Sequence, residues 1–253
     1  MTNKLLYVIQ LLLGPLIFLF FWWLISHLLK QPNIFLSTPE ETIEVLIKLI
    51  ISPQVLIDVT TTFFRVLISF FVALFFGAPL GLLIGSNKKL LLSFEIIIDF
   101  FRSLPSTSLL PLFLLLFGIN DLARIGIAAF VAFWTILFNT LYGVLHSSET
   151  RINVAKTIKA TKIQVLRDVI FWESLPYLFA GMRLALSITL IIVIISEMVV
   201  SPKFGLGVRI YEMQQLYRIP QLYALIIFTG GIGYIVNKIF SLLEKRVVHW
   251  KYK

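Results

Sequence analysis

The stretch Val66–Asn87 reads VLISFFVALFFGAPLGLLIGSN and contains no Asp, Glu, Lys or Arg. A helix that crosses the hydrocarbon core of a bilayer needs roughly 20 consecutive, mostly apolar residues. The whole chain follows the same trend, because 58% of its 253 residues are hydrophobic and only 14% are charged. A soluble domain carries about 25% charged residues. We therefore expect lipid to solvate much of the surface of this protein.

Five further stretches are long and nearly free of charge: Leu5–Leu29, Ser103–Asn120, Ile125–Ser148, Pro176–Val200 and Ile219–Asn237. Ser103–Asn120 is short, and it extends backward through Leu90–Phe101 if Glu95 and Asp99 are tolerated in a span. The pattern predicts an all-α integral membrane protein with six transmembrane helices.

The six helices are expected to form one domain, residues 1–253. No internal repeat or low-complexity linker divides the chain. The first apolar stretch, about residues 5–29, is too long for a cleaved signal peptide and is predicted to be a retained anchor helix. The remaining core is predicted to cover about residues 58–244.

Charge and cysteine content exclude several kinds of site. The chain has no cysteine, so disulfides, thiol nucleophiles and iron–sulfur clusters are excluded. His27, His146 and His249 have no metal-ligand spacing. The net charge of +9 is interpreted as a topology signal rather than as a nucleic-acid interface. With the N-terminus inside, inner segments hold twelve Lys and Arg and outer segments hold six, which predicts that both termini are cytoplasmic.

The longest inner loop, His146 to about Leu175, has a helical pattern. Apolar residues recur at helical spacing in two groups: Ile152, Ala155 and Ile158, then Ile163, Leu166 and Ile170. The pattern predicts one or two short amphipathic helices below the membrane. They either rest on anionic lipid or dock a cytoplasmic partner, and the spacing alone favours neither.

The outer stretch Ser201–Pro220 is predicted to form a turn at Pro202, Gly205 and Gly207, followed by a short surface helix over Val208–Tyr217. It is either a plain connector or a cap on the pathway that touches an external delivery protein.

Small residues and ionisable residues mark two further helices. Gly77, Gly81 and Gly85 share one face, and such a face lets two helix backbones approach closely in lipid. Glu95, Asp99 and Arg102 also share a face and can pair along it. Their helix either lines the pathway or its cytoplasmic mouth, or ends in the headgroup layer.

Pro105 and Pro111 predict two kinks in the third helix, because proline lacks a backbone donor and clashes with the preceding turn. Broken helices often line the substrate route of a transporter, although a passive packing kink is an equal alternative.

Three stretches together resemble one family. Residues 62–85, with Arg65 and the sequence GAPLGLLIG at 77–85, resemble the second helix of binding-protein-dependent ABC importer permeases. The sequence FRSLP at 101–105 and the later FGI at 117–119 resemble the third helix of the nitrate, sulfonate and taurine branch. GMRLAL at 181–186, with Glu197 and the following Gly205-Leu206-Gly207, resembles the fifth helix of that branch and its loop.

The resemblance also identifies the inner loop as the family's coupling helix, although its signature is altered. The family pattern is Glu-Ala-Ala, three residues, Gly, nine residues, Ile, one residue, Leu-Pro. Here the candidate coupling residues are Asn153, Val154, Ala155, Thr157, Ile158, Lys159, Ala160 and Thr161. Lys159 replaces the family's glycine, so the turn needs a strained or different backbone.

The resemblance implies a type I importer permease of the MetI-like architecture, with the coupling helix between helices 4 and 5. It implies a homodimer of permeases, two ABC ATPase subunits that bind the ATP, and an extracytoplasmic solute-binding protein, in a bacterial plasma membrane. It places Arg183 and Glu197 on the helix that lines the pathway, beside the candidates Arg102, Pro105 and Pro111. Glu197 is expected to be a structural partner of an arginine or of the backbone.

Two other classes are weighed against the permease. A self-sufficient secondary transporter usually has ionisable residues in mid-span and internal repeats, and an intramembrane enzyme needs a catalytic motif. The sequence shows neither set of signals, and it has no nucleotide-binding G-x-x-x-x-G-K-[ST] motif. The substrate implied by the resemblance is a nitrate-, sulfonate- or taurine-like anion, or bicarbonate, or a vitamin such as a thiamine-precursor pyrimidine or riboflavin.

Overall fold

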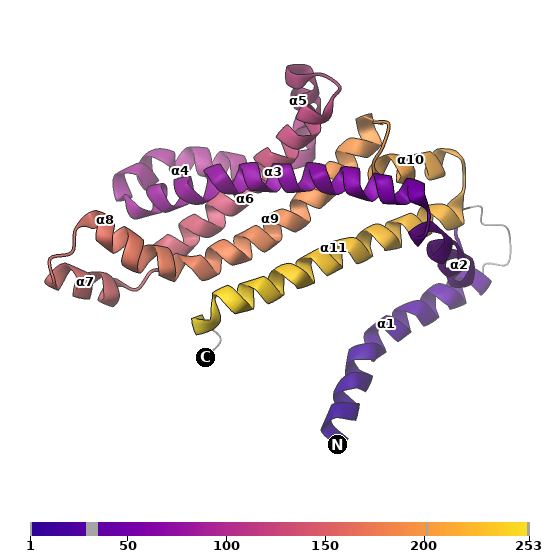
Figure 1. The fold of residues 1–253 in the computed structure, drawn as a ribbon, viewed down its shortest axis with the longest axis horizontal. Coiled ribbons are helices and arrows are strands. Elements are labelled where there is room, and N and C mark those ends of the chain that lie inside the picture. The colour runs from indigo at the N-terminus through magenta and orange to yellow at the C-terminus, as the bar shows by residue number, and fades with distance from the viewer. Residues whose placement is uncertain (1, 29–34, 201, 252–253) are drawn as a thin grey trace.

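The computed structural model describes the backbone of residues 2–28, 35–200 and 202–251, and the side chains of residues 13–28, 35–200 and 202–250. All regular structure in these parts of the chain is helical (Figure 1). The long helices are α1 (Thr2–Leu28), α3 (Pro53–Ser86), α6 (Asp121–Leu145), α9 (Phe171–Val200) and α11 (Ile219–Val247). The shorter α-helices are α2 (Pro39–Ile50), α4 (Lys88–Ser103), α5 (Leu110–Phe117), α7 (Glu149–Thr157), α8 (Lys162–Val165) and α10 (Leu206–Gln215).

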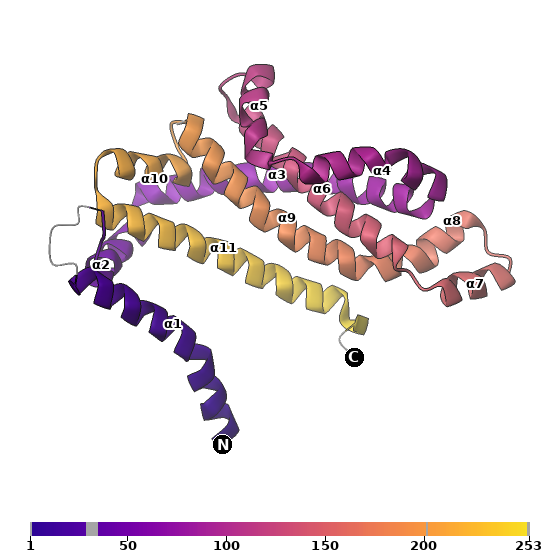
Figure 2. The ribbon, with the colours of Figure 1, turned by 180° about the vertical axis from the view of Figure 1, so that it is seen from behind.

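The core of the bundle is a packed set of three helices, α3, α6 and α9. Their shared interior contains fully buried residues such as Ile127, Ile136 and Val193. Helix α11 lies against α9 and α2, and α1 projects away from the bundle (Figure 2). The outward side of α3 exposes large apolar side chains such as Phe64 and Phe75, as expected of a surface that lipid solvates.

The predicted glycine face of α3 packs against α6 of the same chain. A methyl group on Gly81 would lie 2.8 Å from the carbonyl oxygen of Leu137, and one on Gly85 would lie 2.8 Å from Cβ of Val144. A methyl group on Gly77 would lie 2.9 Å from the carbonyl oxygen of Phe133. Because higher numbers on α3 meet higher numbers on α6, the two helices run parallel.

Gly81→Leu is expected to destabilise the protein strongly, since the new side chain has no space between the two backbones. Overpacking of a core costs about 1–3 kcal/mol, and here backbone atoms are the obstacle. The thermal unfolding midpoint of the purified protein measures this loss. Gly230→Leu on α11 is the matched control, because nothing lies within 4 Å of the added Cβ there. Equal midpoints for the two variants would contradict the assigned packing.

The third predicted helix is broken, not continuous. α4 ends at Ser103, and the following apolar helix is bent away from it by 93°. Leu104 and Pro105 are extended, with ψ angles of 129° and 111°. The kink predicted at Pro105 is therefore a complete break between two helices. The predicted second kink at Pro111 is wrong, because Pro111 lies in the first turn of α5, where the missing N–H has no partner to lose.

Helices α4 and α5 together carry the chain from one end of the bundle back to the other. The end of α3 and the start of α6 lie at opposite ends, because these two helices run parallel. The residues between them must therefore cover that length, and α4 runs back beside α3 before α5 turns outward (Figure 1).

Six spans are not confirmed. In the described residues, four helices are long and apolar enough to cross a membrane, and a fifth crossing is counted if the bent pair is one span. α1 is not among these helices, because its described side chains form only a shorter apolar helix, Leu13–Leu28. The side chains of residues 5–12 and residue 29 of the predicted anchor lie outside the described part.

Two further predictions differ from the structure. α3 starts at Pro53 rather than Val66, because Asp58 and Arg65 are buried in a polar network instead of marking a membrane edge. The predicted surface helix after Gly207 is α10, and its inner side is buried, with Leu206, Val208 and Ile210 at 0–6% exposure.

Candidate coupling site and translocation path

The predicted pair of short inner helices forms an elbow, which we define as α7, α8 and the turn between them, residues 149–165. Ser148 caps the start of α7, and its hydroxyl accepts a hydrogen bond from the N–H of Arg151. Thr161 and Gln164 cap the start of α8 reciprocally, each side chain accepting from the other's backbone N–H. A π-helical turn, Leu166–Ile170, then joins α8 to α9 without a break in the chain's helical path.

Lys159 at the turn of the elbow has a left-handed backbone, with φ of 60°. The N–H of Ala160 donates to the carbonyl of Ala155 at 3.1 Å, and the N–H of Lys159 donates to that of Lys156 at 2.9 Å. This pair of bonds is the Schellman motif, whose left-handed residue is usually glycine. The strain predicted from the missing family glycine is therefore present in the structure.

Lys159→Gly is expected to stabilise the elbow by about 0.5–1 kcal/mol, because glycine adopts the left-handed region without a steric penalty. Proteolytic or hydrogen-exchange protection of the elbow measures this gain. Lys156→Gly, in the last turn of α7, is expected to do the opposite by about 1 kcal/mol, since glycine weakens a helix interior. Destabilisation by both substitutions would contradict the strain at Lys159.

The outward face of the elbow differs from the predicted stripe. Val154, Ile158 and Ile163 are 59%, 77% and 76% exposed, whereas Ala155 is only 8% exposed. The Ala155 side chain therefore lies on the inner side of the elbow, opposite to these three residues. The elbow thus presents three large aliphatic side chains to its surroundings at one end of the bundle, which we call the elbow end.

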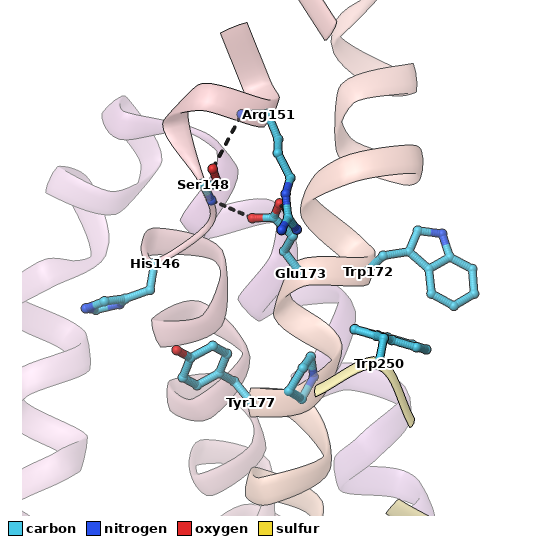
Figure 3. A pocket seen from close by; sticks show the side chains of 8 residues that line it. His146, Ser148, Arg151, Trp172, Glu173, Tyr177 and Trp250 are labelled. Atoms are coloured by element: carbon cyan, nitrogen blue, oxygen red, sulfur yellow. Dashed lines mark hydrogen bonds and ion pairs between the residues drawn. The ribbon is translucent and has the colours of Figure 1, made fainter. Parts of the chain in front are cut away.

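Glu173, in the first turn of α9, ties the elbow to that helix (Figure 3). Its carboxylate accepts a hydrogen bond from the backbone N–H of Ser148 and another, at 2.8 Å, from the guanidinium of Arg151. The Glu173 side chain is only 13% exposed. Glu173 therefore connects the start of α7 with the start of α9.

A groove of about 540 Å³ lies beside this connection, and Figure 3 shows its lining. Trp172 of α9 and Trp250, just beyond α11, meet edge to face across it with ring centroids 5.8 Å apart. The contact places the end of α11 at the elbow end. The lining combines Arg151 and Glu173, already paired with each other, with apolar and aromatic side chains.

At the other end of the bundle, Glu197 of α9 is fully buried and paired. Its carboxylate lies 2.6 Å from a guanidinium nitrogen of Arg65 and accepts hydrogen bonds from the Thr62 hydroxyl and the Gly207 N–H. Arg65 also contacts Asp121 of α6 at 2.9 Å. Residues of α3, α6, α9 and α10 are thereby joined through one arginine and one glutamate.

Asp58 extends this polar network, which we define as Asp58, Thr62, Arg65, Asp121, Glu197 and Arg209 with the backbone of residues 204–207. Asp58 accepts from the Gly205 N–H and pairs with Arg209, both at 2.9 Å. Gly205 has φ of 150°, and a methyl group there would lie 2.6 Å from the Glu197 carboxylate. Only glycine fits between the loop and this carboxylate.

Sequence reasoning missed most of this network, because its members are far apart in the chain. A signal was available in α3, where Asp58, Thr62 and Arg65 recur at helical spacing on one face of an otherwise apolar helix. Arg183, a predicted pathway residue, lies 3.5 Å from Glu244 of α11. It is therefore at a helix–helix contact in this structure.

The predicted charge face of α4 is not internally paired. In the described part of the chain, no salt bridge joins Glu95, Asp99 and Arg102, and all three side chains are exposed. No three His, Asp or Glu side chains in that part gather as a metal site. The polar groups near α4 therefore remain available to solvent, a partner or a solute.

A family model for the binding-protein-dependent transport system inner membrane component matches residues 73–249. The chain belongs to this family. As an ABC permease it is a non-catalytic transmembrane subunit, and a solved structure of the MetNI methionine ABC transporter in an inward facing conformation shares its fold. That structure covers 76% of this chain at a TM-score of 0.63 and 22% identity, with 93% of its own chain matched.

Three curated permeases are also similar. A bicarbonate transport system permease from Synechococcus elongatus is 28% identical over 73% of this chain, and the match spans 66% of that relative's length. The taurine transport system permease of Escherichia coli is 26% identical over 90% of this chain and 85% of its own. The nitrate import permease of a Synechocystis species is 26% identical over 76% of this chain and 70% of its own.

Proposed function

We propose that this permease forms the route by which a small solute bearing an oxyanion enters the cell, with an external binding protein delivering the solute. Bicarbonate, nitrate and taurine permeases among its relatives support this class of substrate, because each of these solutes carries a planar or tetrahedral oxyanion. The permease would perform no bond chemistry and would instead alternate access between the two sides of the membrane.

The elbow is proposed to dock in a groove of a separate ATPase. The observation that carries this assignment is the exposure of Val154, Ile158 and Ile163 on a capped and hydrogen-bonded turn. A rigid scaffold that presents large apolar side chains is typical of a protein interface. A lipid surface is the alternative, and substitution of Ile158 by aspartate distinguishes the two.

The path of the motion follows from the contacts of α9. Closure of the ATPase dimer on ATP would displace α7, and Glu173 would pass the displacement to α9 through Ser148 and Arg151. The polar network holds the far end of α9 to α3, α6 and α10. The helix would therefore tilt about that network rather than slide, which opens one end of the pathway as the other closes.

The assembly is proposed to contain two permease copies and two ATPase subunits in a bacterial plasma membrane. Both termini are proposed to be cytoplasmic, with six crossings that include α1 and the broken pair α4–α5. The contact of Trp250 with Trp172 supports a C-terminus on the same side as the elbow.

Uptake by the reconstituted importer tests the substrate class. The permease, its ATPase and its binding protein are placed in proteoliposomes and supplied with labelled bicarbonate, taurine, nitrate or riboflavin. Uptake of at least one oxyanion, with no uptake of riboflavin, is expected. Uptake of riboflavin alone would overturn the proposed class.

A further inference from the structure

Among the described residues, Arg102 stands out because it carries a charge at the middle of the bundle without a partner. It lies at the end of α4, and it shares a cavity with Val131 and Thr135 near the midpoint of α6 and with Ile188 near the midpoint of α9. Its side chain is exposed, and within the described residues it makes no hydrogen bond or salt bridge.

An unpaired guanidinium at this level is costly if lipid covers it. Charged groups in a membrane protein usually face the bundle interior or a water-filled cavity and mark substrate or ion routes. The break at Pro105 supports the same interpretation, because irregular backbone at membrane depth is tolerated where it lines a cavity. We therefore place Arg102 on the path of the solute rather than on the lipid face.

The cavity beside Arg102 offers hydrogen-bond donors. Trp134 lines it with its ring, whereas its indole nitrogen is enclosed by protein and has no hydrogen-bond partner in the described structure. The Ser106 hydroxyl also lines it and, within that same part, donates to no other group. Among the described side chains, no Asp or Glu is in the lining. Guanidinium and hydroxyl groups suit an anion, and the planar fork of the arginine guanidinium suits an oxyanion in particular.

The size of the cavity limits what it can hold. Its volume is about 150 Å³, whereas pockets for drug-sized ligands have roughly 300–1,000 Å³. Aromatic rings of α6, Phe130 and Phe138, complete its wall, and Trp134 stacks on Phe101 with ring centroids 4.5 Å apart. A small oxyanion fits this space and a vitamin-sized ring system does not.

A second cavity continues the route toward the elbow end. It has a volume of about 290 Å³, and Arg102 lines it together with Asn139, Tyr142 and Leu145. Tyr142 and Leu145 lie in the last turns of α6, directly before the elbow. Arg102 thus stands at the junction of two cavities that follow the groove between α4 and α6.

We propose that Arg102, assisted by Ser106, binds the oxyanion of the solute in mid-membrane during translocation. This inference rests on the proposed function and adds the residues that would select the charge and size of the solute. The site would hold the anion after the binding protein releases it and before the second cavity passes it to the elbow end.

Arg102→Gln is expected to lower ATP-driven uptake of the transported anion roughly ten- to a hundredfold, the factor typical of a lost hydrogen bond to a charged group. Arg102→Lys restores part of the uptake, because it keeps the charge but not the fork. Lys89→Gln, which removes an exposed cation from the first turn of the same helix, is the matched control and leaves uptake unchanged.

Binding-protein-stimulated ATP hydrolysis and the thermal midpoint of Arg102→Gln are expected to match those of the wild type, which separates a lost solute contact from a folding defect. In a second measurement, nitrate, bicarbonate or taurine raises the thermal midpoint of the wild-type permease alone in detergent, and Arg102→Gln loses this shift. If the wild-type importer transports none of these anions but they still raise its thermal midpoint, the proposed function is wrong and the anion site is retained. Wild-type uptake or a wild-type shift in Arg102→Gln overturns the site, as does the absence of any shift in the wild type.

Discussion

Ile158→Asp is expected to abolish ATP-driven uptake while the permease still folds and inserts into the membrane. Ile158 is 77% exposed at the end of α7, so the substitution removes little contact within the chain. If the ATPase covers this side chain, its burial contributes about 1.5–3 kcal/mol per copy. A carboxylate in the same apolar groove costs free energy instead, since it loses its hydration without gaining a partner.

Copurification of the ATPase and uptake in proteoliposomes measure this effect. Asn153→Asp is the matched control, because it adds the same charge to α7 at the position where the family carries glutamate, and it is expected to retain uptake. If the elbow rested on lipid instead, Ile158→Asp would leave the ATPase bound and uptake in place. That result would remove the docking assignment.

Arg65→Met is expected to lower the free energy of unfolding by about 3–5 kcal/mol, because it breaks a buried ion pair from one side only. The substitution leaves Glu197, which is fully buried, with a charge that only the Thr62 hydroxyl and the Gly207 N–H offset. It also removes the contact with Asp121 and the hydrogen bond to the Phe204 carbonyl. The thermal midpoint and the yield of monodisperse protein measure the loss.

A double-substitution cycle measures the interaction energy between Arg65 and Glu197 separately from their contacts with other residues. Arg65→Met combined with Glu197→Gln is expected to be less destabilising than the sum of the two single substitutions, because neither charge is then left alone. Arg167→Met is the control at an exposed salt bridge, with Asp168, and is expected to change stability little. Strict additivity in the cycle, or equal losses for Arg65→Met and Arg167→Met, would contradict the network.

The sequence predicted the helices that consist of long apolar stretches. It misplaced the start of a helix whose first part is held by buried polar contacts. The charge-free stretch Ile125–Ser148 corresponds closely to α6, because a run of apolar residues indicates a lipid environment. The stretch Ile219–Asn237 has the first residue of α11 right, but α11 continues to Val247. The start of α3 was predicted thirteen residues late, since Arg65 reads as a membrane edge unless its partners Glu197 and Asp121 are known.

The position of the elbow in the chain was predicted correctly, but the side on which its apolar side chains lie was not. Helical spacing and the family resemblance located α7 and α8, and the replacement of glycine by Lys159 predicted the strained turn. Spacing could not show which side faces outward, so Ala155 was grouped with Ile158 although Ala155 is buried and Ile158 is exposed. The 93° bend at Pro105 likewise depends on tertiary packing that one proline does not specify.

Uphill uptake with and without the ATPase tests the central claim most directly. Proteoliposomes are loaded with the permease and binding protein alone, with an ATPase that binds but cannot hydrolyse ATP, or with the active ATPase. Accumulation of the labelled anion against its gradient is predicted only with the active ATPase and ATP. Accumulation by the permease alone, driven by a membrane potential or an ion gradient, would instead show that this chain is a self-sufficient transporter.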